Sequence, residues 1–356
     1  KTQLIDSVFQ LIGHSNREVF NAAAECIGLL ATGSMNTILP RVLKQALLVN
    51  DNSVWILATL SMTKRLSLID PNKLHFVGDE FNTISSFLIQ NADYSKPTEK
   101  SIAESFSYMI KINPNEYIKQ LLEIAQTKPE AGPVASHGIA IYFEETANSP
   151  NPYYCFNFIN DIMNSFNADN PRVSEYIILC LKICLRIQKR HYNQENDTSN
   201  LEITTNSEDI PDVNLFEYKE IIFEATKYDE QKQVITIDLG LNQKEAVDIG
   251  INLRLNAINC LILILQMDKE FFNTEELFNL VLWVIKNDPS EEVKSLSISL
   301  LTDIILDKDK AFELFEIISR ESTEFNEIEK IIFTSKTKVD FLEESFFRLL
   351  VAIKIL

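Results

Sequence analysis

The sequence predicts an all-α protein, an α-solenoid of HEAT-like helix pairs forming a superhelix, with one projecting β-hairpin. Three observations favour this fold class. Amphipathic helical patterns recur with a spacing of about 35–43 residues, which is the period of HEAT or armadillo units. Glycine is scarce, with 8 residues in 356, as expected for long helices joined by short turns. One run of β-branched residues interrupts the helical pattern and favours extended chain.

The expected helices follow one another along the chain, because a helix pair cannot bury its apolar face alone and must stack on its neighbours. Ser15 and Glu18 have the spacing of a capping box and open the first clear helix. The gap between the helices around Leu181 and Asn259 corresponds to about two periods. The expected helices span residues 19–30, 53–68, 98–110, 132–143, 173–185, 253–265 and 293–306.

Composition divides the chain into two helical parts. We expect HEAT-like repeats in residues 1–190, a polar and acidic insertion without fixed structure in 191–214, and HEAT-like repeats in 215–356 with the hairpin at about 231–249. The insertion is rich in Asn, Asp, Glu, Ser and Thr, which is typical of disordered segments. Because Leu356 ends the chain within an apolar pattern, we interpret the chain as a fragment of a longer solenoid.

Charge argues against several classes of function. The formal net charge is −18, and no basic stripe is visible, whereas nucleic-acid binders neutralise phosphates with Lys and Arg. An acidic surface instead suits a basic protein partner. No transmembrane run or signal peptide is visible in the sequence, so no membrane contact is expected.

The sequence shows no pattern of residues suited to catalysis or to metal binding. None of the four histidines pairs with another at ligand spacing, and no catalytic or phosphate-binding motif is present. We therefore expect a protein that is not an enzyme, with no cofactor, no metal and no catalytic residue. Trp55 and Trp283 lie on apolar helices and are expected in the core. Five cysteines lie in apolar stretches and are expected to be buried as small hydrophobic residues: Cys26, Cys155, Cys180, Cys184 and Cys260. Their odd number and spacing indicate a reducing compartment, and we expect the protein in the cytoplasm and nucleus.

The hairpin is the strongest functional indication. Residues Val234–Ile237 are all β-branched, Gly240 follows, and Val247–Gly250 precede the return of the helical period. Two strands alone are marginally stable in water, so a lone hairpin on a helical scaffold suits a contact with a partner, and Leu241–Ala246 would form its tip. A long loop folded onto its own repeat is the alternative. The residues expected to contact a partner are Val234, Ile235, Thr236, Ile237, Asp238, Leu239, Gly240, Leu241, Asn242, Gln243, Lys244, Glu245, Ala246 and Val247.

The residues after the hairpin are expected to form a structural motif. Asp248 would cap the following helix, and Gly250 would supply backbone freedom at its start. Arg254 is expected to pair within its own repeat, on the same helix as Leu253.

A resemblance to a known family rests on this region. Residues 234–240 (VITIDLG) and 247–260 (VDIGINLRLNAINC) resemble the stretch VDLGP…VDDGLxLRKAAFEC near the C-terminus of the cullin-associated, neddylation-dissociated proteins, also named TATA-binding-protein-interacting. Leu241 replaces the family's Pro, and Ile249 replaces its second Asp. Less specific segments agree in order: residues 18–24, 39–40, 103–105, 112–114 and 334–339.

The resemblance implies a non-enzymatic regulator of cullin–RING ubiquitin ligases. Members of that family are long α-solenoids that bind unneddylated cullins. Their C-terminal part engages the N-terminal region of the cullin, where a projecting hairpin occupies the site of the substrate-receptor adaptor. Binding and adaptor docking then compete, and receptor exchange follows from a transient ternary state in which each protein speeds the other's dissociation.

Three alternatives remain open from the residues. An importin-β-like transport receptor is also HEAT-built and acidic, and it would bind basic cargo. A phosphatase-type scaffold would carry no exchange role. A transcription regulator that binds the TATA-binding protein would suit the negative charge and the second name of the family.

Overall fold

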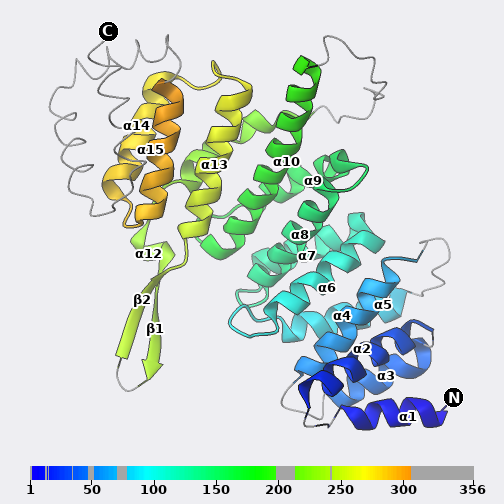
Figure 1. Cartoon of the computed structure of the whole chain (residues 1–356). Helices are drawn as coiled ribbons and strands as arrows, with labels where there is room; N and C mark the ends of the chain where they lie inside the picture. Colours follow the sequence, from blue (N-terminus) through cyan, green and yellow to red (C-terminus); the bar gives the residue numbers. More distant parts are fainter. Residues whose placement is uncertain are drawn as a thin grey trace. The chain divides into compact units, whose positions relative to one another are not determined.

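The computed structural model of the chain describes residues 2–12, 14, 16–33, 35–46, 52–69, 78–197, 213–240 and 243–305. Within these residues the chain is mostly helical, with fifteen α-helices packed in sequential pairs and one antiparallel two-stranded hairpin (Figure 1). The helical class and the hairpin are thus confirmed. The chain divides into two compact units, residues 1–151 and 152–356.

Alternate helices of the first unit lie side by side. Helix α2 packs on α4, α4 on α6 and α6 on α8, while α7 contacts both α6 and α8. Contacts join residues about one predicted period apart: Glu99 bonds His137, 38 residues away, and Asn52 bonds Asn91, 39 residues away. The helices are α1 (Thr2–Leu11), α2 (Arg17–Gly33), α3 (Met35–Ala46), α4 (Ser53–Leu66), α5 (Gly78–Asn91), α6 (Glu99–Ile112), α7 (Pro114–Thr127) and α8 (Gly132–Ala147).

The core of the first unit lies between these helices. Trp55 is 4% exposed, as predicted. Helices α6 and α8 approach closely at Gly138, where an added Cβ would lie 2.7 Å from Phe106 Cβ and 2.9 Å from the Ala103 carbonyl oxygen. Only a residue without a side chain fits at that distance.

The start of α2 corrects the predicted capping box. Asn16 Oδ1 accepts a hydrogen bond from the backbone N–H of Glu18 at 2.8 Å. The Asn16 carbonyl accepts the first helical bond, from Phe20 at 3.1 Å. Asn16 is therefore the N-cap, a position that Asn and Ser fill about equally well, and Ser15 lies outside the described residues.

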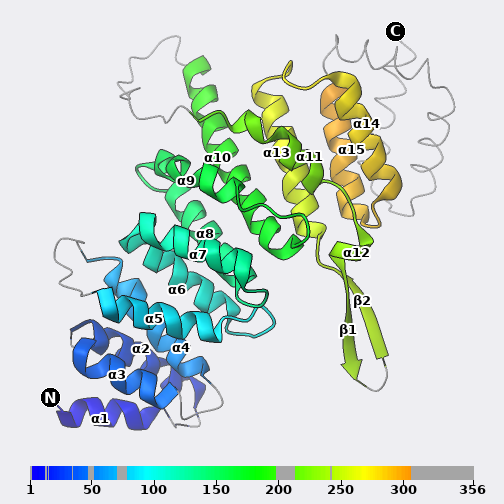
Figure 2. The same ribbon diagram turned by 180° about the vertical axis from the view of Figure 1, so that it is seen from behind.

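The second unit pairs two helices that are far apart in the sequence. Helix α10 packs directly on α13, α13 on α15, and α15 on α14 (Figures 1 and 2). The elements are η2 (Pro152–Cys155), α9 (Phe156–Met163), α10 (Pro171–Asp197), η4 (Leu215–Tyr218), α11 (Lys219–Ala225), α12 (Glu230–Gln233), β1 (Val234–Gly240), β2 (Gln243–Asp248), α13 (Ile251–Met267), α14 (Thr274–Asn287) and α15 (Glu291–Ile305).

The contact between α10 and α13 explains the long gap in the repeat. Lys182 Nζ donates to Asn256 Oδ1 at 2.9 Å, across 74 residues of sequence. Helices α10 and α13 are therefore direct neighbours, and the described residues between them stack no further helix pair in that contact. Helix α10 runs to Asp197, so the predicted insertion begins later than 191. Residues 198–212 lie outside the described residues, as do residues 334–339 and Leu356.

Two residues predicted in the core are exposed. Trp283 is 37% exposed, because it shares the outer face of α14 with Glu276 and Asn287 at helical spacing. Cys26 is exposed, whereas the other four cysteines are buried and all five are free. It shares the outer face of α2 with Leu29, which is exposed as well.

Candidate functional site: the hairpin and its base

The hairpin projects from the helices of the second unit in both views (Figures 1 and 2). Strands β1 and β2 pair antiparallel, with Ile235 opposite Val247 and Ile237 opposite Glu245. Residues 236–238 and 243–246 are exposed. The alternative of a loop folded onto its own repeat is therefore wrong for these residues.

The tip is shorter than the sequence suggested. We expected it at Leu241–Ala246, but Gln243–Ala246 belong to β2. Only Leu241 and Asn242 connect the strands, and both lie outside the described residues. A register shift between Asp238 and Gly240 places an extra residue in β1, as a β-bulge does. Polar side chains such as Gln243, Lys244 and Glu245 are equally compatible with a turn and with an exposed strand.

The two faces of the hairpin differ in chemistry. Successive side chains of a strand point to opposite faces, and residues paired across two strands share a face. Ile235 and Ile237 therefore share one face with Val247 and Glu245, and Thr236 and Asp238 share the other with Ala246 and Lys244. Ile237 is 40% exposed. Three apolar side chains thus continue from the half-buried base of the hairpin into solvent, where Glu245 lies opposite Ile237. We call Ile235, Ile237 and Val247 the apolar face.

Arg254 holds both ends of the hairpin. Its side chain is fully buried. Nη2 donates to Asp248 Oδ2 at 2.6 Å, and Nε donates to Asp288 Oδ2 at 2.6 Å. Nη1 donates to Gln233 Oε1, and the guanidinium carbon lies 5.0 Å from the centre of the Tyr228 ring. The residue before β1, the last residue of β2 and the end of α14 are therefore joined through one side chain of α13.

Burial and ion pairing shift the pKa values of Arg254 and Asp288 in opposite directions. Burial lowers the pKa of Arg254, but hydrogen bonds from its guanidinium to Asp248 and Asp288 more than offset burial, so the pKa is raised and the group stays charged. Burial raises the pKa of Asp288, and its bonds to Arg254 and to the Ser290 N–H offset only part of that rise. The carboxylate of Asp288 therefore depends on Arg254 to remain ionised in the folded protein.

Gly250 is required for space and not for backbone freedom, contrary to expectation. Its φ of −99° and ψ of 0° are accessible to other residues. An added Cβ would lie 2.6 Å from the Gln233 side chain. Asp248 Oδ1 accepts from the Gly250 N–H at 2.9 Å, and Gly250 itself is the N-cap of α13. Leu253 is buried in the core of the unit.

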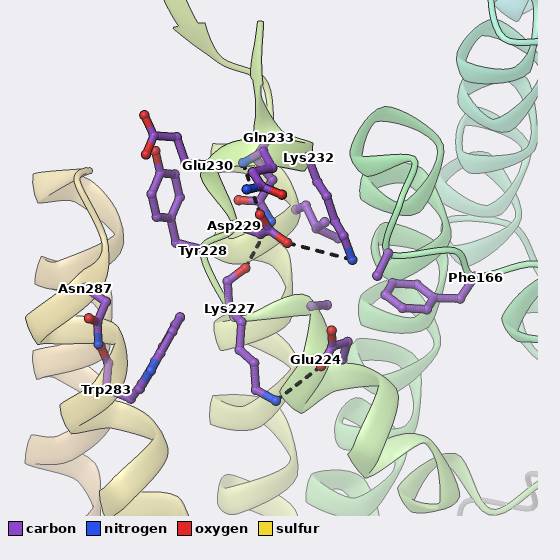
Figure 3. A pocket seen from close by; sticks show the side chains of 14 residues that line it. Phe166, Glu224, Lys227, Tyr228, Asp229, Glu230, Lys232, Gln233, Trp283 and Asn287 are labelled. Carbon is purple, nitrogen blue, oxygen red and sulfur yellow. Dashed lines mark hydrogen bonds and ion pairs between the residues drawn. The ribbon is translucent and has the colours of Figure 1, made fainter.

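A pocket of about 510 Å³ opens at the base of the hairpin (Figure 3). Its walls come from α11, α13 and α14, from the segment that leads through α12 into β1, and from the loop after α9. No sequence pattern predicts this pocket, and the only local indication is the position of Trp283 on the polar face of α14. Its lining residues are Phe166, Ala168, Glu224, Ala225, Lys227, Tyr228, Asp229, Glu230, Gln231, Lys232, Gln233, Leu253, Trp283 and Asn287.

The buried cysteines of the second unit lie near one another. Cys155 Sγ is 3.9 Å from Cys184 Sγ. Burial raises the pKa of the Cys180, Cys184 and Cys260 thiols, which keeps them protonated.

Among the described residues, no three His, Cys, Asp or Glu side chains are placed to hold one metal ion. No helix in the described part of the chain has the length and apolar character needed to cross a membrane.

Comparison with known proteins gives no assignment, because no family model and no curated protein matches the chain.

Proposed function

We propose that this protein is a non-enzymatic interaction protein whose hairpin binds a protein partner through its apolar face. The observation that carries this proposal is the combination of an exposed Ile237 with a base locked by the buried Arg254. A flexible hairpin would lose conformational entropy on binding, which weakens the affinity. A hairpin with a fixed base already presents its apolar face in a defined orientation, so its loss of entropy on binding is smaller.

The helix pairs support a scaffold of HEAT-like repeats, that is, an α-solenoid. In the first unit, helices pack on neighbours about one repeat apart in the sequence, and α13 packs on α15 in the same way in the second unit. A solenoid is built from contacts of this nearest-neighbour kind. Such scaffolds offer extended binding surfaces, and a formal net charge of −18 suits a basic partner.

The proposed partner is the N-terminal region of an unneddylated cullin. Support comes from the resemblance of residues 234–240 and 247–260 to the cullin-associated, neddylation-dissociated proteins. The hairpin would compete there with the substrate-receptor adaptor, and the protein would promote receptor exchange on cullin–RING ligases. The protein would act in the cytoplasm and nucleus and would need no cofactor.

A hairpin truncation tests this proposal. Ile235 and Val247 already face each other, so replacing residues 236–246 by Asn-Gly should close a shortened hairpin with a two-residue turn. The Arg254 cluster stays intact, because Gln233 and Asp248 are retained. A pull-down compares both proteins on an unneddylated cullin, with and without excess adaptor.

The intact protein should bind the cullin, and adaptor should compete it away, whereas the truncated protein should not displace adaptor. If the truncated protein displaces adaptor as well as the intact one does, the hairpin mechanism is wrong. If neither binds, the cullin is not the partner.

A further inference from the structure

The pocket at the base of the hairpin has aromatic walls. Trp283 on α14 is 37% exposed and lines the pocket, together with Phe166 and Tyr228. Figure 3 shows Trp283 and Phe166 on opposite sides of the segment that carries Asp229 and Lys232. An exposed tryptophan in a concave site is typical of the centres of protein interfaces, where Trp, Tyr and Arg supply most of the affinity.

The lining of the pocket holds one more acidic side chain than basic side chains. Lys227 Nζ lies 3.2 Å from Glu224 Oε2. Lys232 Nζ lies 2.8 Å from Asp169 Oδ1 and 3.8 Å from Asp229 Oδ2. Both lysines are thus held by acidic neighbours.

Glu230 is different. Within the described residues, its carboxylate makes no ion pair and no hydrogen bond, and the side chain is exposed. The pocket therefore combines an exposed indole with an excess negative charge.

We infer that this pocket receives an arginine side chain of the partner that the hairpin binds, an inference that rests on the proposed function. The planar guanidinium would stack on the indole of Trp283, and Glu230 would offset its charge. Gln233 lines the pocket and directly precedes β1. A partner segment lying along the hairpin would therefore pass the pocket mouth. The volume of about 510 Å³ lies within the usual range of small-ligand sites, about 300–1,000 Å³.

The two tryptophans of the chain allow a direct test on the whole protein. Trp283 is exposed and Trp55 is 4% exposed, so their two indole ¹⁵N–H signals report on the pocket and on a buried control. The W283F variant assigns the signals. The probe is N-acetyl-arginine amide, and its matched controls are N-acetyl-citrulline amide, which has the same shape without the charge, and N-acetyl-lysine amide, which has the charge without the plane.

The arginine probe should shift the Trp283 signal in a saturable manner and leave the Trp55 signal in place. The citrulline probe should bind about two- to fivefold more weakly, since an exposed cation–π contact contributes about 0.5–1 kcal/mol. The lysine probe should also bind more weakly, because its ammonium keeps the charge but has no plane to stack on the indole. The E230Q variant should weaken arginine binding about two- to fivefold.

Three results would overturn the inference: an unmoved Trp283 signal, equal binding of citrulline, or equal binding of lysine. The probes need no partner, so this experiment fails independently of the cullin pull-down. If the truncated protein loses cullin binding but the Trp283 signal does not respond to the arginine probe, the proposed function is retained. The inference that the pocket binds arginine is then wrong.

Discussion

Arg254 and Asp248 form an ion pair, with Nη2 and Oδ2 2.6 Å apart, that ties the last residue of β2 to the first turns of α13. Arg254 is fully buried, and Asp288 joins it from the end of α14. The hairpin is thus not a loosely attached loop, because its base belongs to the buried polar part of the second unit.

Replacing Arg254 by Met should strongly destabilise the second unit. The change keeps much of the volume but leaves Asp248 and Asp288 without their cation, and removing one partner of a buried ion pair costs about 3–5 kcal/mol. Denaturant unfolding followed by circular dichroism measures the loss. Lys294→Met is the control, because Lys294 pairs with Glu291 on the surface of α15, a contact that contributes about 0.2–0.5 kcal/mol. Equal losses in the two variants would show that the Arg254 cluster does not stabilise the fold.

The stability that Asp288 contributes should depend on pH. Burial raises its folded pKa above the ordinary value of 3.8, so its contribution is fully present below 3.8 and is lost as the pH rises through the raised folded value. Compared with Asp288→Asn, the wild type should gain free energy of unfolding as the pH falls from about 7 to about 4. The opposite slope would mean that pairing with Arg254 outweighs burial.

Gly250→Ala should destabilise the protein only while Gln233 is present. An added Cβ would lie 2.6 Å from the Gln233 side chain. That side chain cannot move freely, because its Nε2 donates to the Lys227 carbonyl at 2.9 Å and its Oε1 accepts from Arg254. Overpacking of this kind costs about 1–3 kcal/mol.

A double-mutant cycle isolates this effect. In a Gln233→Ala background the Gly250→Ala change should cost much less, because the new methyl group then finds space. Gly33→Ala is the matched control, since an added Cβ there meets no atom within 4 Å, and its effect should be small. Additive losses at 233 and 250 would contradict the contact.

One cysteine of five should react rapidly with a thiol reagent in the folded protein. Cys26 is exposed and the other four are buried, and burial raises the pKa of Cys180, Cys184 and Cys260. Because the thiolate is the reactive form, these thiols should react only after unfolding. Titration with an aromatic disulfide in buffer and in denaturant counts them. The Cys26→Ser variant should show no fast reaction, and a remaining fast thiol would contradict the burial.

Local sequence patterns predicted secondary-structure elements better than they predicted which residues come into contact after folding. Helical period and β-branched runs predicted the hairpin and seven of the fifteen helices of the described residues, namely α2, α4, α6, α8, α10, α13 and α15, because both patterns depend on neighbouring residues. The connection at Leu241–Asn242 was misjudged, since Gln243–Ala246 are polar in an exposed strand as they would be in a turn. The role of Gly250 was missed because its constraint comes from Gln233, 17 residues earlier in the chain and close only after folding.

The pocket illustrates the same limit. Trp283, Phe166 and Glu230 lie on three segments that folding brings together, and no spacing in the sequence relates them. Trp283 was assigned to the core because α14 is apolar on most sides. A helical projection places it with Glu276 and Asn287, so its exposure was predictable while its neighbours were not.

The most direct test of the proposed function is the affinity of an unneddylated cullin N-terminal domain for three point variants, measured by biolayer interferometry. Ile237→Asp places a charge on the apolar face, and Thr236→Asp places the same charge on the opposite face. Leu29→Asp is the control, because Leu29 is an exposed aliphatic residue of the first unit, 46% exposed.

Burial of an isoleucine contributes about 1.5–3 kcal/mol, so Ile237→Asp should weaken binding about tenfold or more. Thr236→Asp should weaken it less, and Leu29→Asp should leave it unchanged. If Ile237→Asp binds the cullin as tightly as Leu29→Asp does, the apolar face of the hairpin is not the binding surface.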